Sequence, residues 1–402
     1  MFERAILTPT DVLRAAVPEQ SLRVGARVLT RSDGELVLSD ALCQIRVLTP
    51  LALDLEPGFL VAFDGTWNGT ALAHAELVWS EAAPAPTSSG EFSRLLFDGV
   101  GARLVQRAQA LKLVRRFFDE LSFLEVETPT RVRAPNLDAN IEPVSASGAW
   151  LVTSPELHLK RLIVGGLPRV FEFSRCHRAE ELGPYHEPEF TLLEWYRAFE
   201  PVESVMRDTE TLVRGVITAL SGQGSIVHRG HTVDLEKPFV RMSVAEAFER
   251  HAHRSDGLEL AERDPQAWFR LWVESIEPAL VAYESPVFIL DYPVSQAALA
   301  RRKPGDARVA ERFELYCAGV ELCNGFGELT DSKEQRARFE EELGARRARG
   351  AASLPLDERF LAALQEGMPP CSGNALGFDR LILLATGADS LTGVQTFSWN
   401  RN

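Results

Sequence analysis

Three short segments of the sequence carry charged and aromatic residues at spacings that suit the binding of a nucleotide and a cation. The first is predicted to form two strands, residues 168–177 and 189–197, joined by a polar turn. Its candidate site residues are Arg178, Glu180, His186, Phe190, Glu194 and Tyr196. Side chains alternate between the faces of a strand, so Phe190, Glu194 and Tyr196 share one face. A ring and a carboxylate there could hold a base and a cation, and the planar guanidinium of Arg178 suits phosphate. The alternative interpretation is a solvated hairpin with surface ion pairs.

The second segment, FELYCAGVELCNGFGELTD, contains three glutamates spaced seven residues apart, at Glu314, Glu321 and Glu328. A spacing of seven suits one face of a helix, but the three glycines in this segment disfavour a helix, so we expect a hairpin. In a regular strand Glu321 and Glu328 would face opposite sides, which predicts a bulge near Gly325–Gly327. Apolar neighbours surround each carboxylate, and buried carboxylates need cations or other partners. Two such groups near a phosphate-binding residue suggest Mg²⁺, which proteins hold by one or two carboxylates plus substrate oxygens.

The third segment is CSGNALGFDR, which ends at Arg380 and runs into the apolar helical sequence LILLATG. Its small residues would let a ligand approach the backbone closely. Arg380 would open the helix, and the N-terminus of a helix favours anions. Taken alone, a glycine-containing strand before a helix is weak evidence for a site.

A larger body must position these segments. Apolar residues at helical spacing predict a helix over 101–121, followed by a short strand at 124–127. Further helices are predicted at 203–220, 243–253, 265–278 and 332–348, and further strands at 286–291, 312–316, 320–328 and 373–378. Antiparallel strands with helices packed outside indicate an α+β domain. Neither GxGxxG nor GxxxxGK[ST] occurs, which argues against Rossmann and P-loop folds.

A separate module is predicted at the N-terminus. Five short alternating runs between residues 22 and 80, separated by turn residues, predict a small β-barrel of the OB type. The stretch EAAPAPTSSG is typical of a linker. Residues 1–90 contain six Arg, no Lys and eleven acidic residues, so we expect a structural or partner-docking role rather than nucleic-acid binding. We therefore divide the chain into an OB-like module (1–82), a linker (83–91) and a catalytic domain (92–402).

Composition narrows the function classes further. The 402-residue chain has a net charge of −14, which argues against a protein that coats nucleic acid. Its five cysteines are odd in number and form no CxxC pair, which favours reduced thiols over a disulfide framework or a zinc site. No secretion signal and no apolar run of membrane-spanning length is present in the sequence. We therefore expect a soluble, cytoplasmic protein.

Together, the three segments resemble the signature motifs of class II aminoacyl-tRNA synthetases of the lysyl subgroup. Residues 101–129 resemble motif 1, RCHRAEELGPYHEPEF resembles motif 2, and GNALGFDRL resembles motif 3. A closer resemblance is to the elongation factor P lysine ligases, which lack the anticodon-binding domain of the synthetases. VTSPELHLKRL, the terminus TFSWNRN and Ala375 carry this resemblance, because lysyl-tRNA synthetases have glycine where these ligases have alanine. His177, Ala179 and Glu187 depart from the family pattern, and residues 1–90 are additional to the ligases.

The resemblance implies a homodimeric ligase that uses ATP and Mg²⁺ to activate a lysine-type amino acid as an adenylate. The amino acid that the resemblance favours is (R)-β-lysine. The acceptor it implies is a lysine side chain of elongation factor P. Arg178 and Arg380 would be catalytic, and ATP would bind to Arg178, Glu180, His186, Phe190, Glu314 and Arg380. Mg²⁺ would bind to Glu314 and Glu321, and the amino acid to Ser154, Glu156, Glu194, Tyr196, Asn324, Glu328 and Ala375.

Two alternatives to this ligase stay open. The first is a lysyl-tRNA synthetase, against which the acidic net charge and Ala375 argue. The second is a catalytically silent, synthetase-like binding protein. The presence of both motif arginines and of Glu314 and Glu321 argues against this second alternative.

Overall fold

The computed structural model describes residues 5–49 and 54–401 of the chain. It divides into two compact units, Met1–Val105 and Gln106–Asn402. Residues 82–90, which include most of the predicted linker, contain no helix or strand. The boundary between the units falls beyond that linker, within helix α3 (Val100–Glu120).

The N-terminal unit is a closed five-stranded barrel with the strand order β1-β2-β3-β5-β4. Its core contains residues fully or almost fully buried, such as Val24, Leu38, Val47 and Phe63. The prediction of a small OB-like barrel is therefore confirmed. Its elements are α1 (Pro9–Ala15), β1 (Gln20–Ser32), β2 (Glu35–Ser39), β3 (Gln44–Leu48), β4 (Leu60–Trp67), β5 (Ala71–Glu81) and the following α2 (Glu91–Leu96).

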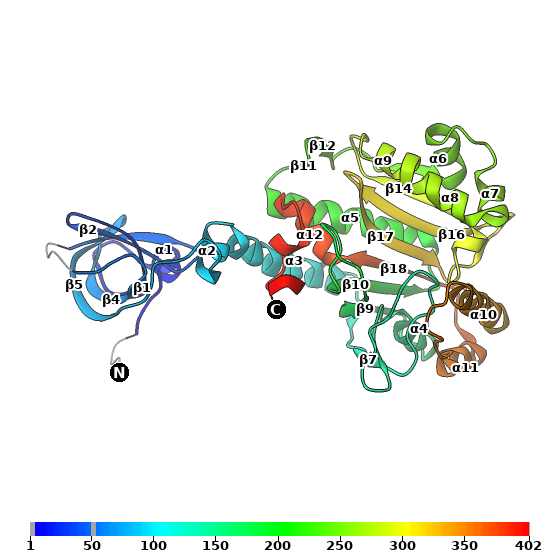
Figure 1. Ribbon diagram of the computed structural model, residues 1–402, viewed down its shortest axis with the longest axis horizontal. Helices are drawn as coiled ribbons and strands as arrows, with labels where there is room; N and C mark the ends of the chain where they lie inside the picture. The colour runs from blue at the N-terminus through cyan, green and yellow to red at the C-terminus, as the bar shows by residue number, and fades with distance from the viewer. Residues whose placement is uncertain (1–4, 50–53, 402) are drawn as a thin grey trace. The chain divides into compact units, whose positions relative to one another are not determined.

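The second unit is built on a nine-stranded, mainly antiparallel sheet with the order β13-β14-β16-β17-β18-β10-β9-β6, in which β15 pairs with β16 (Figure 1). Two small two-stranded sheets, β7-β8 and β11-β12, lie outside it. This arrangement confirms the predicted α+β class. The strands are β6 (Leu124–Glu125), β7 (Arg131–Val132), β8 (Trp150–Leu151), β9 (Arg169–His177), β10 (Glu189–Ala198), β11 (Ser225–His228), β12 (His231–Asp234), β13 (Val240–Ser243), β14 (Val287–Pro293), β15 (Arg302–Lys303), β16 (Asp306–Cys317), β17 (Val320–Gly327) and β18 (Cys371–Gly377).

Helices pack around this sheet at the places that the periodicity predicts, and α4, α7 and α11 are additional helices that it did not predict. The predicted helix at 265–278 is broken by a π-helical turn, Trp272–Ile276. The helices are α4 (Glu156–Val164), α5 (Val202–Ser221), α6 (Val244–His251), α7 (Gly257–Arg263), α8 (Pro265–Leu271), α9 (Glu277–Leu280), α10 (Ser332–Ala348), α11 (Glu358–Gly367) and α12 (Phe378–Thr386).

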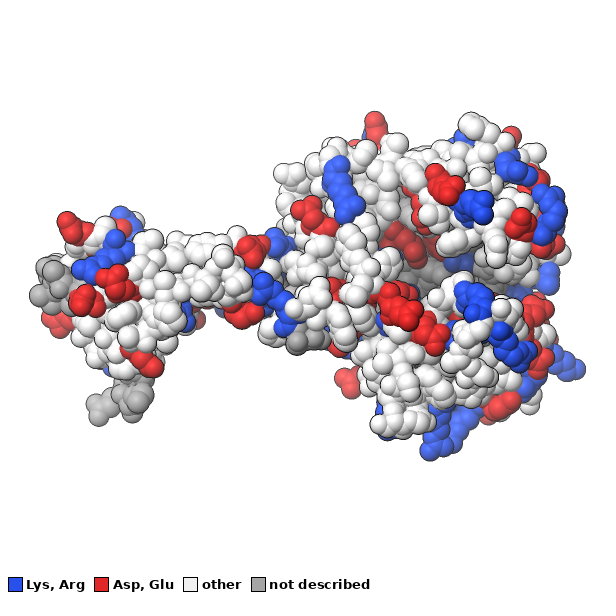
Figure 2. Space-filling model, in the orientation of Figure 1, with Lys and Arg blue, Asp and Glu red and all other residues white. Residues whose placement is uncertain are grey.

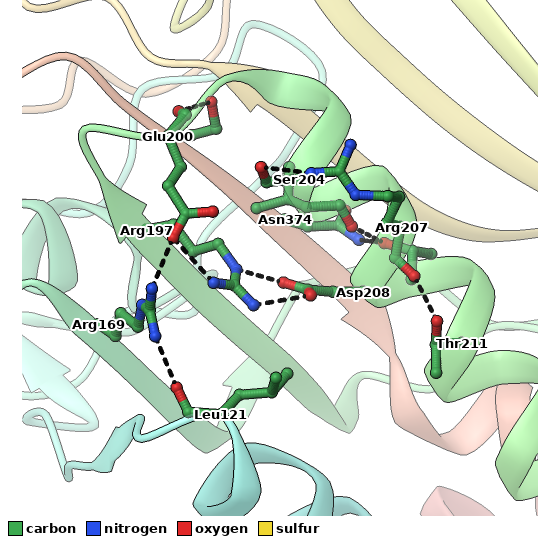
Figure 3. Close-up of polar contacts among 12 residues, drawn as sticks. Leu121, Arg169, Arg197, Glu200, Ser204, Arg207, Asp208, Thr211 and Asn374 are labelled. Carbon is green, nitrogen blue, oxygen red and sulfur yellow. Dashed lines mark hydrogen bonds and ion pairs between the residues drawn. The ribbon is translucent and has the colours of Figure 1, made fainter.

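One face of the central strands packs against α3, α5 and α12. Val114, Phe118 and Trp195 are fully buried in this core. Arg197 of β10 also points to this side and forms a two-bond ion pair with Asp208 of α5, at 2.6 and 2.8 Å (Figure 3). Neighbouring residues of a strand point to opposite faces, so Glu194 and Tyr196 are left for the other side of the sheet.

The predicted bulge is in the wrong place. Leu315 pairs with Cys323 whereas Tyr316 pairs with Glu321, so Leu322 is the extra residue and the irregularity does not lie at Gly325–Gly327. The parity argument itself is confirmed, because the extra residue Leu322 lies between Glu321 and Glu328 and shifts the alternation once, as the argument required. Only the position of the bulge was predicted wrongly.

Candidate active site

Four candidate residues form a row across neighbouring strands. Glu194 of β10 pairs with Ala375 of β18, which pairs with Asn324 of β17. Asn324 in turn pairs with Glu314 of β16. Residues directly opposite each other in antiparallel strands point to the same face. The pairing register therefore collects on one face side chains that lie far apart in the sequence.

A glycine in the next row lets two candidate residues lie close to the sheet. Gly373 pairs with Tyr196, and a Cβ on Gly373 would overlap the Tyr196 ring and would lie 2.8 Å from Oε1 of Glu328. Only glycine fits this position without displacing both side chains. The small residues of the third segment thus make room for candidate side chains.

Arg178, just after β9, and Phe190, four residues before Glu194 on β10, lie together. The Arg178 guanidinium lies 5.0 Å from the centroid of the Phe190 ring, which is cation–π geometry. Its Nε is buried without a partner among the described residues, and its Nη1 lies 3.7 Å from Glu181. A partly buried guanidinium with donors to spare is suited to bind an anion.

Arg380 lies at the start of α12 and joins the second and third segments. Its Nη2 donates a 2.8 Å hydrogen bond to Nε2 of His186, and its Nη1 donates to the backbone carbonyl of Glu321. Loss of water around the imidazole and the nearby Arg380 charge lower the pKa of His186. A neutral imidazole has the free acceptor nitrogen that this bond requires.

An acidic group faces these arginines. Glu314 pairs with Arg312 and accepts hydrogen bonds from Tyr292 at 2.5 Å and Tyr316 at 2.7 Å. Burial and the charge of Glu314 raise the pKa of Glu321. Burial and these two carboxylates raise the pKa of Glu277, which sequence reasoning missed, to about 7. Carboxylates that disfavour each other's ionisation would gain from a bound cation.

The carboxylates of this acidic cluster suit an Mg²⁺ ion that is held jointly by the protein and by substrate phosphate oxygens. Among residues 5–49 and 54–401, no three His, Cys, Asp or Glu side chains are grouped as ligands of a metal ion. Mg²⁺ needs no such cage, because one or two carboxylates can hold it together with phosphate oxygens. Glu314 and Glu321 are two carboxylates of this type, beside the arginine that would bind the phosphates.

Toward β9, a second group of candidate residues surrounds Glu194. Ser154 donates a 2.6 Å hydrogen bond to Oε1 of Glu194, and Tyr196 donates a 3.3 Å bond to Oε2. Burial and the nearby Glu156 raise the pKa of Glu194 to about 8. Because Glu194 is fully buried, its ionised form calls for a cationic partner.

The remaining amino-acid residues are joined by a lysine that sequence reasoning missed. Nζ of Lys160 lies 2.5 Å from Glu156 and 2.6 Å from Glu328. Even with this partner, burial raises the pKa of Glu328 to about 7. The spacing of four residues between Glu156 and Lys160 on a helix is a signal that could have suggested their contact.

A second group of residues that sequence reasoning missed, centred on Asp379, connects motif 3 to motif 1 and to the strand of motif 2. Asp379, next to Arg380, forms a 2.5 Å ion pair with Arg107 of α3. It also accepts hydrogen bonds from the backbone N–H of Thr191 and from Gln395, both at 3.0 Å. Positions such as these orient site residues without touching a ligand.

The departures from the family pattern lie at the edge of the site. Glu187 is buried and accepts a 2.9 Å hydrogen bond from the backbone N–H of Trp399, and Nε2 of His177 lies 3.7 Å from Glu189. Ala179 contributes a backbone hydrogen bond to the carbonyl of Glu142. Glu180 is exposed with φ 66°, and it is the candidate residue that the structure does not bring into the groups above.

Comparison with known proteins agrees with this geometry. The model of the family "tRNA synthetases class II (D, K and N)" matches residues 91–401. The chain belongs to this family. It is also 39% identical over 322 residues to an elongation factor P–(R)-β-lysine ligase of Hamiltonella defensa subsp. Acyrthosiphon pisum (strain 5AT). That match covers 75% of this chain and 96% of the relative.

The chain is thus a class II synthetase-like ligase that is homologous to the elongation factor P–(R)-β-lysine ligases, and its family activates substrates with ATP. The resemblance drawn from the three motif segments is confirmed. Within the described residues, no helix has the length and apolar character needed to cross a membrane.

Proposed function

We propose that this protein activates (R)-β-lysine with ATP as an aminoacyl-adenylate and transfers it to a lysine side chain of elongation factor P in the cytoplasm. The observation that carries the proposal is the row from Glu194 through Ala375 to Glu314, which would join an amine-binding end to a phosphate-binding end. The substrate and the acceptor come from the printed name of the relative.

In the first step, the substrate carboxylate displaces pyrophosphate at the α-phosphorus of ATP. This step needs positioning and charge neutralisation more than covalent catalysis. Arg178 would hold the α-phosphate and the substrate carboxylate, and His186 and Arg380 would hold the outer phosphates. Phe190 would stack on adenine, and Glu180 would contact it.

Mg²⁺ would be held by Glu314 and Glu321 and would neutralise phosphate charge. This assignment is supported by the raised pKa of Glu321, which burial and the charge of Glu314 produce and which a bound cation would counteract. Glu314 also counts among the ATP-binding residues.

The substrate amino groups would bind at the buried carboxylates. Glu194 offers one of them, with Ser154 and Tyr196 holding its oxygens in place. Glu156 and Glu328 lie close by, and Asn324 and Ala375 continue the row toward the phosphates. Buried carboxylates are a suitable match for a substrate with two ammonium groups.

A lysyl-tRNA synthetase is the second candidate, because the N-terminal barrel is of the type that often binds single-stranded nucleic acid. Charge disfavours it. Basic side chains are interspersed with acidic ones on the face drawn in Figure 2, and they form no continuous basic surface there. We propose a structural or acceptor-docking role for the module at 1–82, joined by the linker at 83–91 to the catalytic domain at 92–402.

We further propose that the active form is a C₂ homodimer, the commonest closed symmetry. Helix α3 buries Ala110, Val114 and Phe118 in the core of its own unit. Its Val105 is 43% exposed, and Leu111 and Phe117 are only partly buried. This remaining apolar surface supports an interface.

The decisive experiment incubates the enzyme with ATP, Mg²⁺ and labelled (R)-β-lysine or (S)-α-lysine, with elongation factor P or tRNA as the acceptor. Label on elongation factor P is expected, and label on tRNA alone would establish the second candidate instead. ATP–pyrophosphate exchange measures the first step separately. Arg178→Ala should slow that exchange by about 10²–10³, the cost of losing a donor that stabilises developing charge. Arg175→Ala, at an exposed arginine of β9 three residues before Arg178, is the control.

A further inference from the structure

The lysine at position 160 is one of the most deeply buried charged residues of the protein. Its relative exposure is 0%, although lysine is almost never fully buried unless it is paired. Its ammonium contacts two carboxylates from distant parts of the chain, Glu156 on α4 and Glu328 after β17, at 2.5 and 2.6 Å. The role of such a residue depends on the charges that surround it.

The charged groups around Lys160 can be counted. Glu156, Glu194 and Glu328 are 7, 0 and 0% exposed, and all three carboxylates raise the pKa of Tyr196, so they act on one small volume. Lys160 supplies one positive charge to that volume. When a substrate with two ammonium groups binds and all three carboxylates are ionised, the single ammonium of Lys160 leaves two negative charges for the substrate to neutralise.

Two other charged residues border this cluster but have partners of their own. Arg301, which acts on Glu328, forms a 2.5 Å ion pair with Glu311. Glu172, which pairs with Glu194 across the strands, accepts hydrogen bonds from the backbone and the side chain of Thr128. Neither residue changes the count.

We propose that Lys160 is a specificity-determining residue that sets how many substrate ammonium groups the site accepts. By neutralising one of three buried carboxylates, it leaves a site for an amino acid with two ammonium groups and disfavours one with a single ammonium group. This inference rests on the proposed function, because it takes Glu156, Glu194 and Glu328 as the amine-binding groups. The inference assigns a role in substrate recognition to Lys160, which contacts Glu156 and Glu328.

A purely structural role makes the opposite prediction for one combination of substitutions. In Glu156→Gln, Lys160 would still neutralise Glu328, and one negative charge would remain for the substrate. Adding Lys160→Met, which preserves most of the side-chain volume, would release Glu328 and restore two negative charges. If Lys160 only holds α4 to the end of β17, the second substitution can only do further damage.

The experiment is a double-mutant cycle on ATP–pyrophosphate exchange, with wild type, Glu156→Gln, Lys160→Met and the double variant. Each protein is given the lysine isomer that wild type prefers and an analogue of equal length in which a methyl group replaces the terminal ammonium. For wild type we expect a preference for the diamino substrate on the order of 10⁴ in kcat/KM, since a site built for a polar group rejects analogues that lack it. We expect that preference to fall at least ~100-fold in Glu156→Gln and to recover at least ~10-fold in the double variant.

A folded double variant whose preference is equal to or lower than that of Glu156→Gln would overturn the proposal. The same cycle built on Glu328→Gln, in which Glu156 is the carboxylate released, provides a second test. Because both double variants keep the net charge of the wild-type cluster, both are expected to fold, and circular dichroism showing both unfolded would also contradict the proposal. Wild-type exchange with neither lysine isomer would instead refute the proposed function, so the two failures are distinguishable.

Discussion

Removing the methyl group of Ala375 should change which lysine isomer the enzyme prefers. Ala375 lies between Glu194 and Asn324 in the row and is only partly buried, so its methyl faces the proposed substrate. In (R)-β-lysine the amine lies one carbon further from the carboxylate than in (S)-α-lysine. The two isomers must therefore take different paths past this methyl group.

The magnitude follows from the position of Ala375. A methyl-sized difference in contact with a substrate is worth about 1–3 kcal/mol, or roughly 10–200-fold. Glycine in a strand costs about 0.5–1 kcal/mol of stability, but this cost applies equally to both substrates. Ala375→Gly should thus raise kcat/KM for (S)-α-lysine relative to (R)-β-lysine by about 10-fold or more.

The assay is ATP–pyrophosphate exchange with each isomer, with Ala198→Gly as the matched control. Ala198 lies on β10 and pairs with Cys371, so it undergoes the same chemical change in the same sheet but outside the row. An unchanged isomer ratio in Ala375→Gly, or an equal change in Ala198→Gly, would show that Ala375 only packs against its neighbours. The reasoning from the row would then be refuted.

Two further predictions concern pH and the N-terminal module. Since the pKa of Glu194 is raised to about 8, the folded protein holds a proton that the unfolded chain releases above about 4.5, and stability falls as pH rises between those values. Glu194→Gln mimics the protonated acid, so the difference between its Tm and the Tm of wild type should grow from pH 5 to 8 and stay constant above pH 8. A difference that stays constant from pH 5 to 8 would contradict the raised pKa of Glu194. Residues 92–402 alone should fold and catalyse the exchange, because the family match begins at residue 91. A folded truncation without exchange would place the module in the active site, and one that loses only transfer would assign it to docking the acceptor.

Periodicity predicted many of the elements of the second unit, because it is a local property of the sequence. The strand that contains Glu194 and the helix that contains Arg380 follow from alternation and from apolar spacing. The bulge at Leu322 did not follow from the local pattern, since its position depends on how β16 meets β17. Register is a property of two strands, and one sequence segment specifies it only in part.

The contacts of Lys160 likewise show that a local sequence pattern reveals only contacts within one element. Its contact with Glu156 is visible as a helical spacing of four, but its contact with Glu328 joins α4 to the end of β17. The mutual effect of Glu277, Glu314 and Glu321 likewise arises only when their elements pack together. Sequence reasoning found residues with the chemistry required for the site, whereas the fixed partners of those residues required the tertiary structure.

The row across the sheet has a consequence for how the protein acquires activity during folding. Its four members lie on four strands whose pairing brings together residues from Glu194 to Ala375. Contacts between residues so far apart in the sequence cost loop-closure entropy before they contribute stability, so they form late and slowly. Only Glu314 and Asn324 are close in sequence, across the β16–β17 hairpin, so the row is completed only when β18 pairs with both β17 and β10. A chain released or cleaved before that moment carries every motif and yet has no site.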